Sequence, residues 1–271
     1  MRNLLLFTFL SVVLMSSSCD NTKPQVELSS DISLNFNANY DGELLLLEKE
    51  YAYEGDMPIK FSQFNFYIAN IVLLKQNGSE FEETELLEID FVDFPYNINQ
   101  ETEAEKGQTI QIGNIPVGEY DGIRIGFGVP TDLNRTKTND YGSESPLSMA
   151  SHYWDGWSSY IFSKIEGKAD MNFNGEFETN EGEGLTYHMG TDEVYTTRTL
   201  FGNFTLSENG TLELKLNVDL KKLFVMPNPD FDANNDGYLD IEEFESVHAE
   251  DRLVIAKQMM NNYSDAISLD D

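Results

Sequence analysis

The chain is poor in the residues that usually carry soft-metal or redox chemistry, and it is poor in positive charge. Its 271 residues include one cysteine, three histidines and two tryptophans. A single cysteine cannot form an internal disulfide, so the fold must be held together without one. Lysine and arginine number 17 against 48 acidic residues, for a formal net charge of −31. Phosphate binding needs clustered basic side chains, so this balance argues against nucleic acid and against docking on anionic lipid. The acidic excess serves solubility, or it raises the local concentration of divalent cations.

Long apolar runs are also lacking, except near the N-terminus. Arg2 precedes a run from Leu4 to Met15, and small residues lead to Cys19. The run is shorter than the roughly 20 residues that cross a bilayer, so we predict a signal segment over 1–18. The sequence Ser16-Ser17-Ser18-Cys19 resembles a bacterial lipobox, although Ser16 stands where leucine is usual.

A lipidated Cys19 explains why the only cysteine lies there. The alternative is an ordinary cleaved signal with a stray thiol. The lipid anchor predicts a protein of a Gram-negative cell envelope, at the outer membrane or cell surface. It would have a tether over 19–30, one domain over 31–271, and no membrane contact except the anchor.

Signatures of catalysis are missing as well. The chain has no glycine-rich phosphate loop, no Gly-x-Ser-x-Gly elbow and no His-Glu-x-x-His helix. His248 lies among Glu245, Glu250 and Asp251, which is typical of a solvated helix face. We therefore expect a binding protein and no enzyme.

Apolar residues alternate with polar ones along most of the chain, which is typical of half-buried antiparallel strands. The clearest series are Ile32, Leu34, Phe36; Phe64, Phe66, Ile68; Ile123, Ile125, Phe127; and Leu212, Leu214, Leu216, Val218, Leu220. Asn77-Gly78 and Asn209-Gly210 supply the positive φ of tight hairpin turns. One helix is expected near the end, where helical spacing relates Ala256, Met259, Met260, Tyr263 and Ile267. The prediction is a mainly β, antiparallel β-sandwich with a C-terminal helix and with the acidic stretch 99–106 as a solvated loop.

A calcium-loop pattern of the EF-hand type occupies 232–243, and every position of it is satisfied. Gly237 permits the sharp bend, Leu239 can pin the loop to the core, and a helix should follow through Phe244 and Val247. The alternative is an Asx-rich turn without metal. The expected oxygen donors are Asp232, Asn234, Asp236, Tyr238 through its carbonyl, Asp240 and Glu243.

A second stretch with the same spacing begins at Asp170, but its flanks have strand character. Two asparagines at its centre weaken the negative field, so we expect lower calcium affinity than at 232–243, or a plain hairpin turn. The donors would be Asp170, Asn172, Asn174, Glu176 through its carbonyl, Glu178 and Glu181.

The scarce residues gather between Met149 and Gly190. Both tryptophans, Trp154 and Trp157, and two of the histidines, His152 and His188, fall in this stretch. Imidazole nitrogen and thioether sulfur are soft donors that favour copper, so the stretch is a candidate copper site. The alternative is an aromatic cluster over the core with histidine at its polar edge.

Several short motifs follow one another in a characteristic order: Phe66-Tyr67-Ile68-Ala69-Asn70-Ile71-Val72-Leu73, Ile115-Pro116-Val117-Gly118-Glu119-Tyr120-Asp121-Gly122-Ile123 with Gly126-Phe127-Gly128-Val129-Pro130 after it, Tyr153-Trp154 with a second tryptophan, Tyr160-Ile161-Phe162, Lys164-Ile165-Glu166-Gly167 and Tyr187-His188-Met189-Gly190. Their order resembles the MbnP-like family of copper-binding bacterial envelope proteins, which is linked to methanobactin uptake and to the MopE/CorA proteins.

In that family a tryptophan near a histidine can be oxidised to kynurenine by a di-haem partner and then joins two histidines around copper. The resemblance implies His188 as a copper ligand, Trp154 as the modified residue and His152 as a further ligand. The chain departs from the usual Met-aromatic-Trp-x-Trp motif, because its tryptophans are three residues apart and His152 stands where methionine is common.

Together these features predict a lipid-anchored extracytoplasmic protein that binds structural calcium, with copper as a second candidate. The alternative is a surface adhesion or glycan-binding module whose exposed tryptophans contact ligand while calcium orders its loops.

Overall fold

The computed structural model describes residues 28–177, 184–248 and 252–270. The predicted signal segment, Cys19, and residues Glu178 and Glu181 of the second loop lie outside these ranges. None of the helices in the described ranges is long and apolar enough to cross a membrane.

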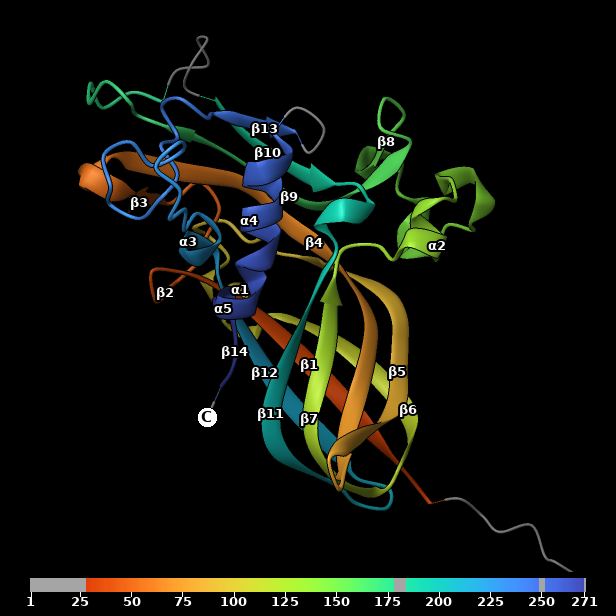
Figure 1. Ribbon diagram of the computed structural model, residues 1–271. Coiled ribbons are helices and arrows are strands. Elements are labelled where there is room, and N and C mark those ends of the chain that lie inside the picture. Colours follow the sequence, from red (N-terminus) through yellow and green to blue (C-terminus); the bar gives the residue numbers. More distant parts are fainter. Residues whose placement is uncertain (1–27, 178–183, 249–251, 271) are drawn as a thin grey trace, which may run out of the picture.

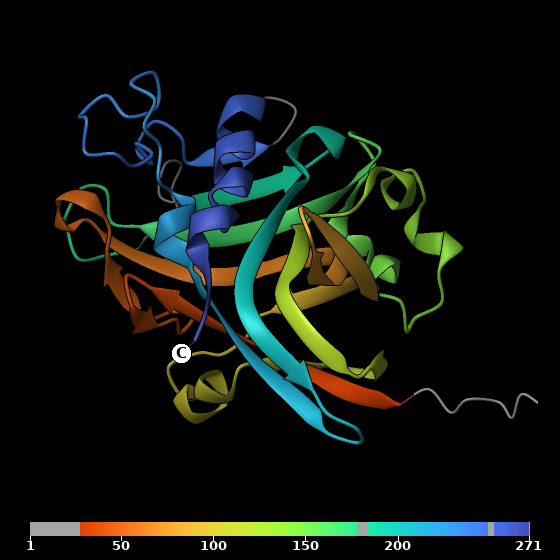
Figure 2. The same ribbon diagram turned by 60° about the horizontal axis from the view of Figure 1, so that its bottom comes forward.

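Two β-sheets face each other and form a sandwich (Figures 1 and 2). The first sheet has five strands in the order β14-β12-β1-β2, with β6 also paired to β1. Its strands are β1 Ser29–Tyr40, β2 Glu43–Leu44, β6 Gln108–Pro116, β12 Thr211–Asp219 and β14 Ile267–Leu269.

The second sheet has nine strands in the order β11-β7-β4-β9-β10-β13, with β3 and β5 paired to β4 and β8 paired to β9. Its strands are β3 Glu50–Ala52, β4 Pro58–Asn77, β5 Glu80–Asp93, β7 Gly118–Phe127, β8 Tyr153–Trp154, β9 Ser159–Ala169, β10 Gly184–Gly190, β11 Thr196–Leu206 and β13 Ser246–His248. The β-sandwich prediction is confirmed.

The sheets are mixed, whereas antiparallel strands were predicted throughout. β1 pairs with β12 in parallel, and so does β10 with β13. The Asn209-Gly210 turn, with Asn209 at φ 54°, leads from β11 of one sheet to β12 of the other. That turn is therefore no hairpin. Asn77-Gly78 does close one, between β4 and β5, with Gly78 at φ 66°.

Strand β4 passes from the upper to the lower part of the molecule in Figure 1 and is buried on both faces in its middle. Phe64, Phe66 and Ile68 lie on the core face, as the alternation predicts, but Asn65 and Tyr67 on the other face are covered too. The segment that follows β7 covers Asn65 and Tyr67. The Tyr67 hydroxyl donates to Pro146 O at 3.0 Å, and the Tyr67 ring meets that of His152 edge-on. The outer face of this sheet can therefore hold buried polar groups.

Helices are few and short. They are α1 Glu101–Lys106, α2 Thr131–Asn134, α3 Leu220–Leu223, α4 Leu253–Asn261 and α5 Tyr263–Ala266, with single 3₁₀ turns η1 Glu54–Asp56, η2 Thr138–Asp140, η3 Pro146–Ser148, η4 Ala150–His152 and η5 Asp192–Val194. The stretch 99–106 was wrongly predicted as a loop. It forms α1 because Ala104 is buried and the Asn37 amide donates to Ala104 O at 3.1 Å.

The predicted C-terminal helix is present as α4, which packs on β10 and β13. All residues of its predicted apolar stripe are buried. The helical path breaks at Asn262, whose amide donates to Leu223 O and Val225 O at 3.0 and 2.7 Å. Tyr263 consequently starts α5, and Ile267 starts β14.

Candidate metal centres

The first half of the loop 232–243 is closed by hydrogen bonds from its own N–H groups to its side-chain oxygens. The carboxylate of Asp232, 5% exposed, accepts from Asp236 N and Gly237 N, both at 3.0 Å. Asn234 Oδ1 accepts from Asp236 N at 2.9 Å, and Asp236 Oδ1 accepts from Tyr238 N at 2.9 Å. Gly237 has φ 91°, which side chains rarely tolerate. The loop therefore has the sharp bend at Gly237 that the pattern predicts.

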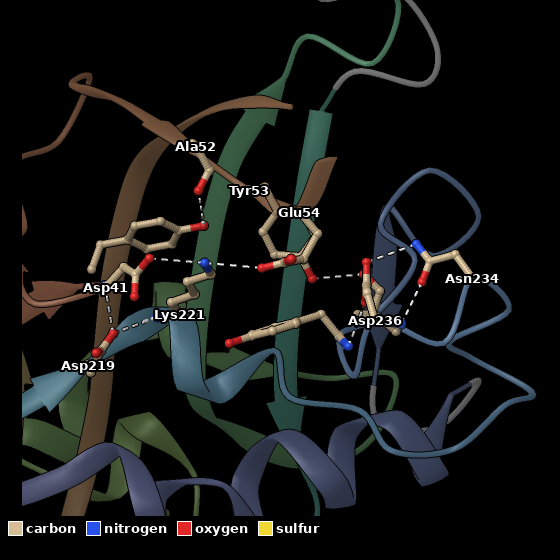
Figure 3. Close-up of polar contacts among 11 residues, drawn as sticks. Asp41, Ala52, Tyr53, Glu54, Asp219, Lys221, Asn234 and Asp236 are labelled. Atoms are coloured by element: carbon tan, nitrogen blue, oxygen red, sulfur yellow. Dashed lines mark hydrogen bonds and ion pairs between the residues drawn. The ribbon is translucent and has the colours of Figure 1, made fainter. Parts of the chain in front are cut away.

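The loop is attached to the sandwich at its second half. Leu239 is buried, its N–H donates to Phe224 O at 2.9 Å, and its carbonyl accepts from the Tyr53 hydroxyl at 2.8 Å. Figure 3 shows Tyr53 and the loop residues Asn234 and Asp236 in the same region as Lys221, whose ammonium lies 3.1 Å from both Asp41 and Glu54. Leu239 therefore pins the loop as predicted. No helix follows, because residues 241–243 form a turn and β13 begins at Ser246.

The second loop repeats these contacts at matching positions. Asp170 accepts from Asn174 N at 3.0 Å and from Gly175 N at 2.8 Å, and Asn172 Oδ1 accepts from Asn174 N at 3.0 Å. Gly175 has φ 82°. The two loops are neighbours, since Phe173 and Asn234 line the same pocket of about 460 Å³. The candidate donors Glu178 and Glu181 lie outside the described residues.

A row of polar side chains crosses the outer face of the nine-stranded sheet. The strand register aligns Asn65 of β4 with Lys164 of β9, Lys164 with His188 of β10, and His188 with His248 of β13. Asp93 of β5 continues the row on the other side of Asn65. The row brings His188 next to His248, 5.4 Å between ring centroids. This neighbour of His188 was missed, because His248 was assigned to a solvated helix face and instead lies on β13.

His188 is mostly enclosed, and its two ring nitrogens are in different situations. Its Nε2 lies 2.8 Å from Glu166 Oε1, and its side chain is 12% exposed. Its Nδ1 is buried and has no hydrogen-bond partner in the structure. Burial lowers the pKa of His188, the bond to Glu166 opposes this shift, and the nearby Lys164 ammonium adds to it. A neutral imidazole with one unused nitrogen is the form that binds a metal.

The tryptophans complete this cluster. The rings of Trp154 and Trp157 lie 5.9 Å apart, and their centroids are 6.3 and 5.9 Å from that of His248. Trp157 packs over Gly190, where a Cβ atom would come within 3.2 Å of the ring. Trp154 is 47% exposed. We call His188, His248, Trp154 and Trp157 the histidine–tryptophan cluster.

His152 lies apart from this cluster, over β4 and β5. Its ring is 5% exposed and meets that of Phe91 at 4.7 Å. Its Nε2 lies 3.0 Å from Asn65 Oδ1, whose amide in turn donates to Asp93, and its Nδ1 lies 3.0 Å from Ser151 Oγ. Burial lowers the pKa of His152 to about 4, aided by the charge of Lys164. Both nitrogens thus already have protein partners.

Scarcity of histidine was the one sequence signal that pointed to His248, because the chain has only three. Local pattern could not find it, since the contact depends on the parallel register of β10 and β13. Across the described residues, no three His, Cys, Asp or Glu side chains gather as a ready metal site. A metal at the histidine–tryptophan cluster would therefore rest on two imidazoles. That donor set suits soft Cu⁺ better than Zn²⁺, which prefers four ligands.

Sequence comparison identifies the family to which this β-sandwich belongs. The sequence profile of the MbnP family matches residues 29–244, most of the chain, so the chain belongs to this family. MbnP from Methylosinus trichosporium has a similar solved structure, with a TM-score of 0.49 and 12% sequence identity over 72% of this chain and 78% of that one. A comparison with curated proteins found no match.

Proposed function

We propose that this protein is a lipid-anchored, extracytoplasmic metal-binding protein that holds copper at the histidine–tryptophan cluster and calcium at the loop 232–243. The observation that carries the copper proposal is the buried, unpartnered Nδ1 of His188 beside His248. An unsatisfied buried nitrogen costs about 1–3 kcal/mol, and a metal ion removes that cost. His188 and His248 would hold the ion through nitrogen, while the tryptophans would exclude water around it.

Family membership supports a role for a tryptophan as well. In the family that the sequence resembles, a di-haem partner oxidises a tryptophan to kynurenine. Trp154 is the more accessible ring here, 47% exposed, and it stacks toward both Trp157 and His248. We infer that Trp154 is the residue such a partner would modify. Intact mass of natively expressed protein tests this, and a mass equal to that of the unmodified chain contradicts it.

The calcium proposal rests on the Asx turns of 232–243, in which side-chain oxygens of Asp232, Asn234 and Asp236 accept from N–H groups of the same loop. The anchoring proposal rests on Cys19. Cys19→Ser should move the protein from the membrane fraction to the soluble fraction, or leave its signal uncleaved. Membrane fractionation unchanged by the substitution would refute the anchor.

The decisive experiment is titration of purified protein with Cu⁺ against a competing chelator. Wild type should take up one copper ion, and His188→Ala should take up none. His152→Gln is the matched control, because it changes the other buried histidine of this face and should keep the copper. A wild-type protein that binds calcium and a polysaccharide but no copper would favour the adhesion or glycan-binding alternative.

A further inference from the structure

We propose that Glu166 is the positioning residue of the histidine–tryptophan cluster. It fixes His188 as the tautomer protonated at Nε2, so that Nδ1 is the nitrogen that binds metal. This inference rests on the proposed copper site. It adds a carboxylate to a cluster that was defined by four rings, and it identifies which nitrogen of His188 donates to the metal.

The strand register places Glu166 where it can do this. Glu166 lies on β9 opposite Thr186 of β10, two residues along from the Lys164–His188 pair. Successive residues of a strand alternate faces, so Glu166, Lys164 and His188 share the outer face. The resulting diagonal contact is short, 2.8 Å from Glu166 Oε1 to His188 Nε2. Diagonal neighbours on adjacent strands are within reach of long side chains such as glutamate.

The chemistry of the contact decides the tautomer. An ionised carboxylate only accepts hydrogen bonds, so the nitrogen that faces it must carry the proton. A neutral His188 with Nε2–H has its lone pair on Nδ1. That is the atom which is buried without a partner. If Nε2 were the metal donor instead, the ion would displace Glu166 and leave Nδ1–H buried and unpaired.

The environment keeps Glu166 in this role. Lys164 and Lys168 lie two residues to either side of Glu166 on β9, and Lys164 directs its ammonium to Ser151 O at 2.9 Å. Glu166 is 35% exposed in its side chain, so water can solvate its second oxygen. Carboxylate–histidine–metal arrangements of this kind orient the ring and raise its basicity, and their loss usually weakens metal binding about ten- to a hundredfold.

The test combines a metal-free and a metal-bound measurement on protein labelled with ¹⁵N-histidine. Long-range ¹H–¹⁵N correlation of the metal-free protein should show His188 protonated at Nε2. Glu166→Ala should produce a mixture of tautomers, and Glu166→Gln an intermediate case, because an amide can either donate or accept. Competitive titration should show Cu⁺ affinity falling about ten- to a hundredfold in Glu166→Ala. The same spectra report whether each variant is folded.

Glu83→Gln is the matched control. Glu83 is on β5 of the same sheet and pairs with Arg124 at 2.6 Å, so the substitution removes one carboxylate without touching a histidine. It should change neither the tautomer nor the affinity. His188 protonated at Nδ1 in wild type, or a Glu166→Ala variant with wild-type tautomer and affinity, would overturn the inference.

The two proposals fail in different ways. If wild type binds Cu⁺ through Nε2 of His188, the copper site stands and the role of Glu166 is refuted. If wild type binds no Cu⁺, the copper proposal is refuted, and with it the assignment of Nδ1 as a metal donor. The metal-free spectrum then decides separately whether Glu166 sets the tautomer.

Discussion

The loop 232–243 takes its candidate oxygen donors from one short continuous segment, whereas the histidine–tryptophan cluster takes its rings from β8, β10, β13 and the turn after β8. In the loop, contacts such as those from Asp236 N and Gly237 N to Asp232 span only four or five residues. In the cluster, His188 and His248 meet only because two parallel strands align them. One candidate site is a property of a segment, and the other is a property of the fold.

The donors differ in the same way. Carboxylate, amide and carbonyl oxygens are hard ligands that suit calcium, and flexible loops can gather the six to eight of them that calcium needs. Imidazoles are softer, and two of them suffice for Cu⁺ if their nitrogens are held in place. The rigid strands hold His188 and His248, so damage to one centre should leave the other intact.

The largest expected effect is on copper. His248→Ala should weaken Cu⁺ binding by more than about a hundredfold, because one imidazole alone is a poor site. The same variant should keep the full calcium-dependent rise in melting temperature. Chelator competition measures the first quantity and thermal unfolding the second. Loss of both responses together would show that the two centres are one unit.

The next effect is on calcium. Calcium at a hundredfold excess over its Kd should stabilise the protein by about 2.7 kcal/mol, which raises Tm by roughly 5 to 10 °C. Glu243→Gln should remove most of this gain, because it loses a bidentate carboxylate. Melting curves in EDTA and in millimolar calcium measure it, and His188→Ala serves as control. An equal shift in wild type and Glu243→Gln would place the ion elsewhere.

A smaller effect sharpens the contrast between His152 and His188. The folded pKa of His152 is about 4, below its unfolded value of 6.5, so the unfolded state binds the extra proton as the pH falls. Near neutral pH this loss of stability is nearly absent, because His152 is then mostly neutral in both states. It lowers the unfolding free energy by about 2 kcal/mol at pH 5 and about 3 kcal/mol at pH 4, and it levels off below that pH. Between neutral pH and about pH 5, wild type should therefore lose about 2 kcal/mol more unfolding free energy than His152→Gln. Denaturant unfolding of both proteins at these two pH values measures the difference. Parallel losses in both proteins would refute it.

The smallest effect concerns the second loop. Asp170→Asn removes one charge from a loop that has asparagine at two central positions, so it should lower the calcium stabilisation by only about 1 kcal/mol. Asp170 accepts from Asn174 N through Oδ1 and from Gly175 N through Oδ2, so the asparagine amide keeps an oxygen for one of these two N–H groups. The relevant quantity is the difference between the melting temperature in calcium and that in EDTA, compared between wild type and variant. A reduction as large as that in Glu243→Gln would make the loops equal partners.

Much of the fold could be predicted from the order of the residues. Alternation placed Ile32, Leu34 and Phe36 on a buried face, and all three are fully buried in β1. The stripe through Met259 and Met260 placed the C-terminal helix. The parallel pairing of β1 with β12 could not be predicted, because alternation shows which face a residue takes and not which strand lies beside it.

The sequence by itself determined the first half of the loop 232–243, down to the positive φ at Gly237, since side chains of this half accept from N–H groups only two to five residues away. It also determined where tryptophan and histidine gather along the chain. Only the tertiary structure decided which histidines meet. Turn η4 carries His152 to Asn65, which satisfies its Nε2, while the adjacent Ser151 satisfies its Nδ1. Strand register carries His248 to His188, because parallel strands align residues far apart in the chain and no local pattern encodes that distance.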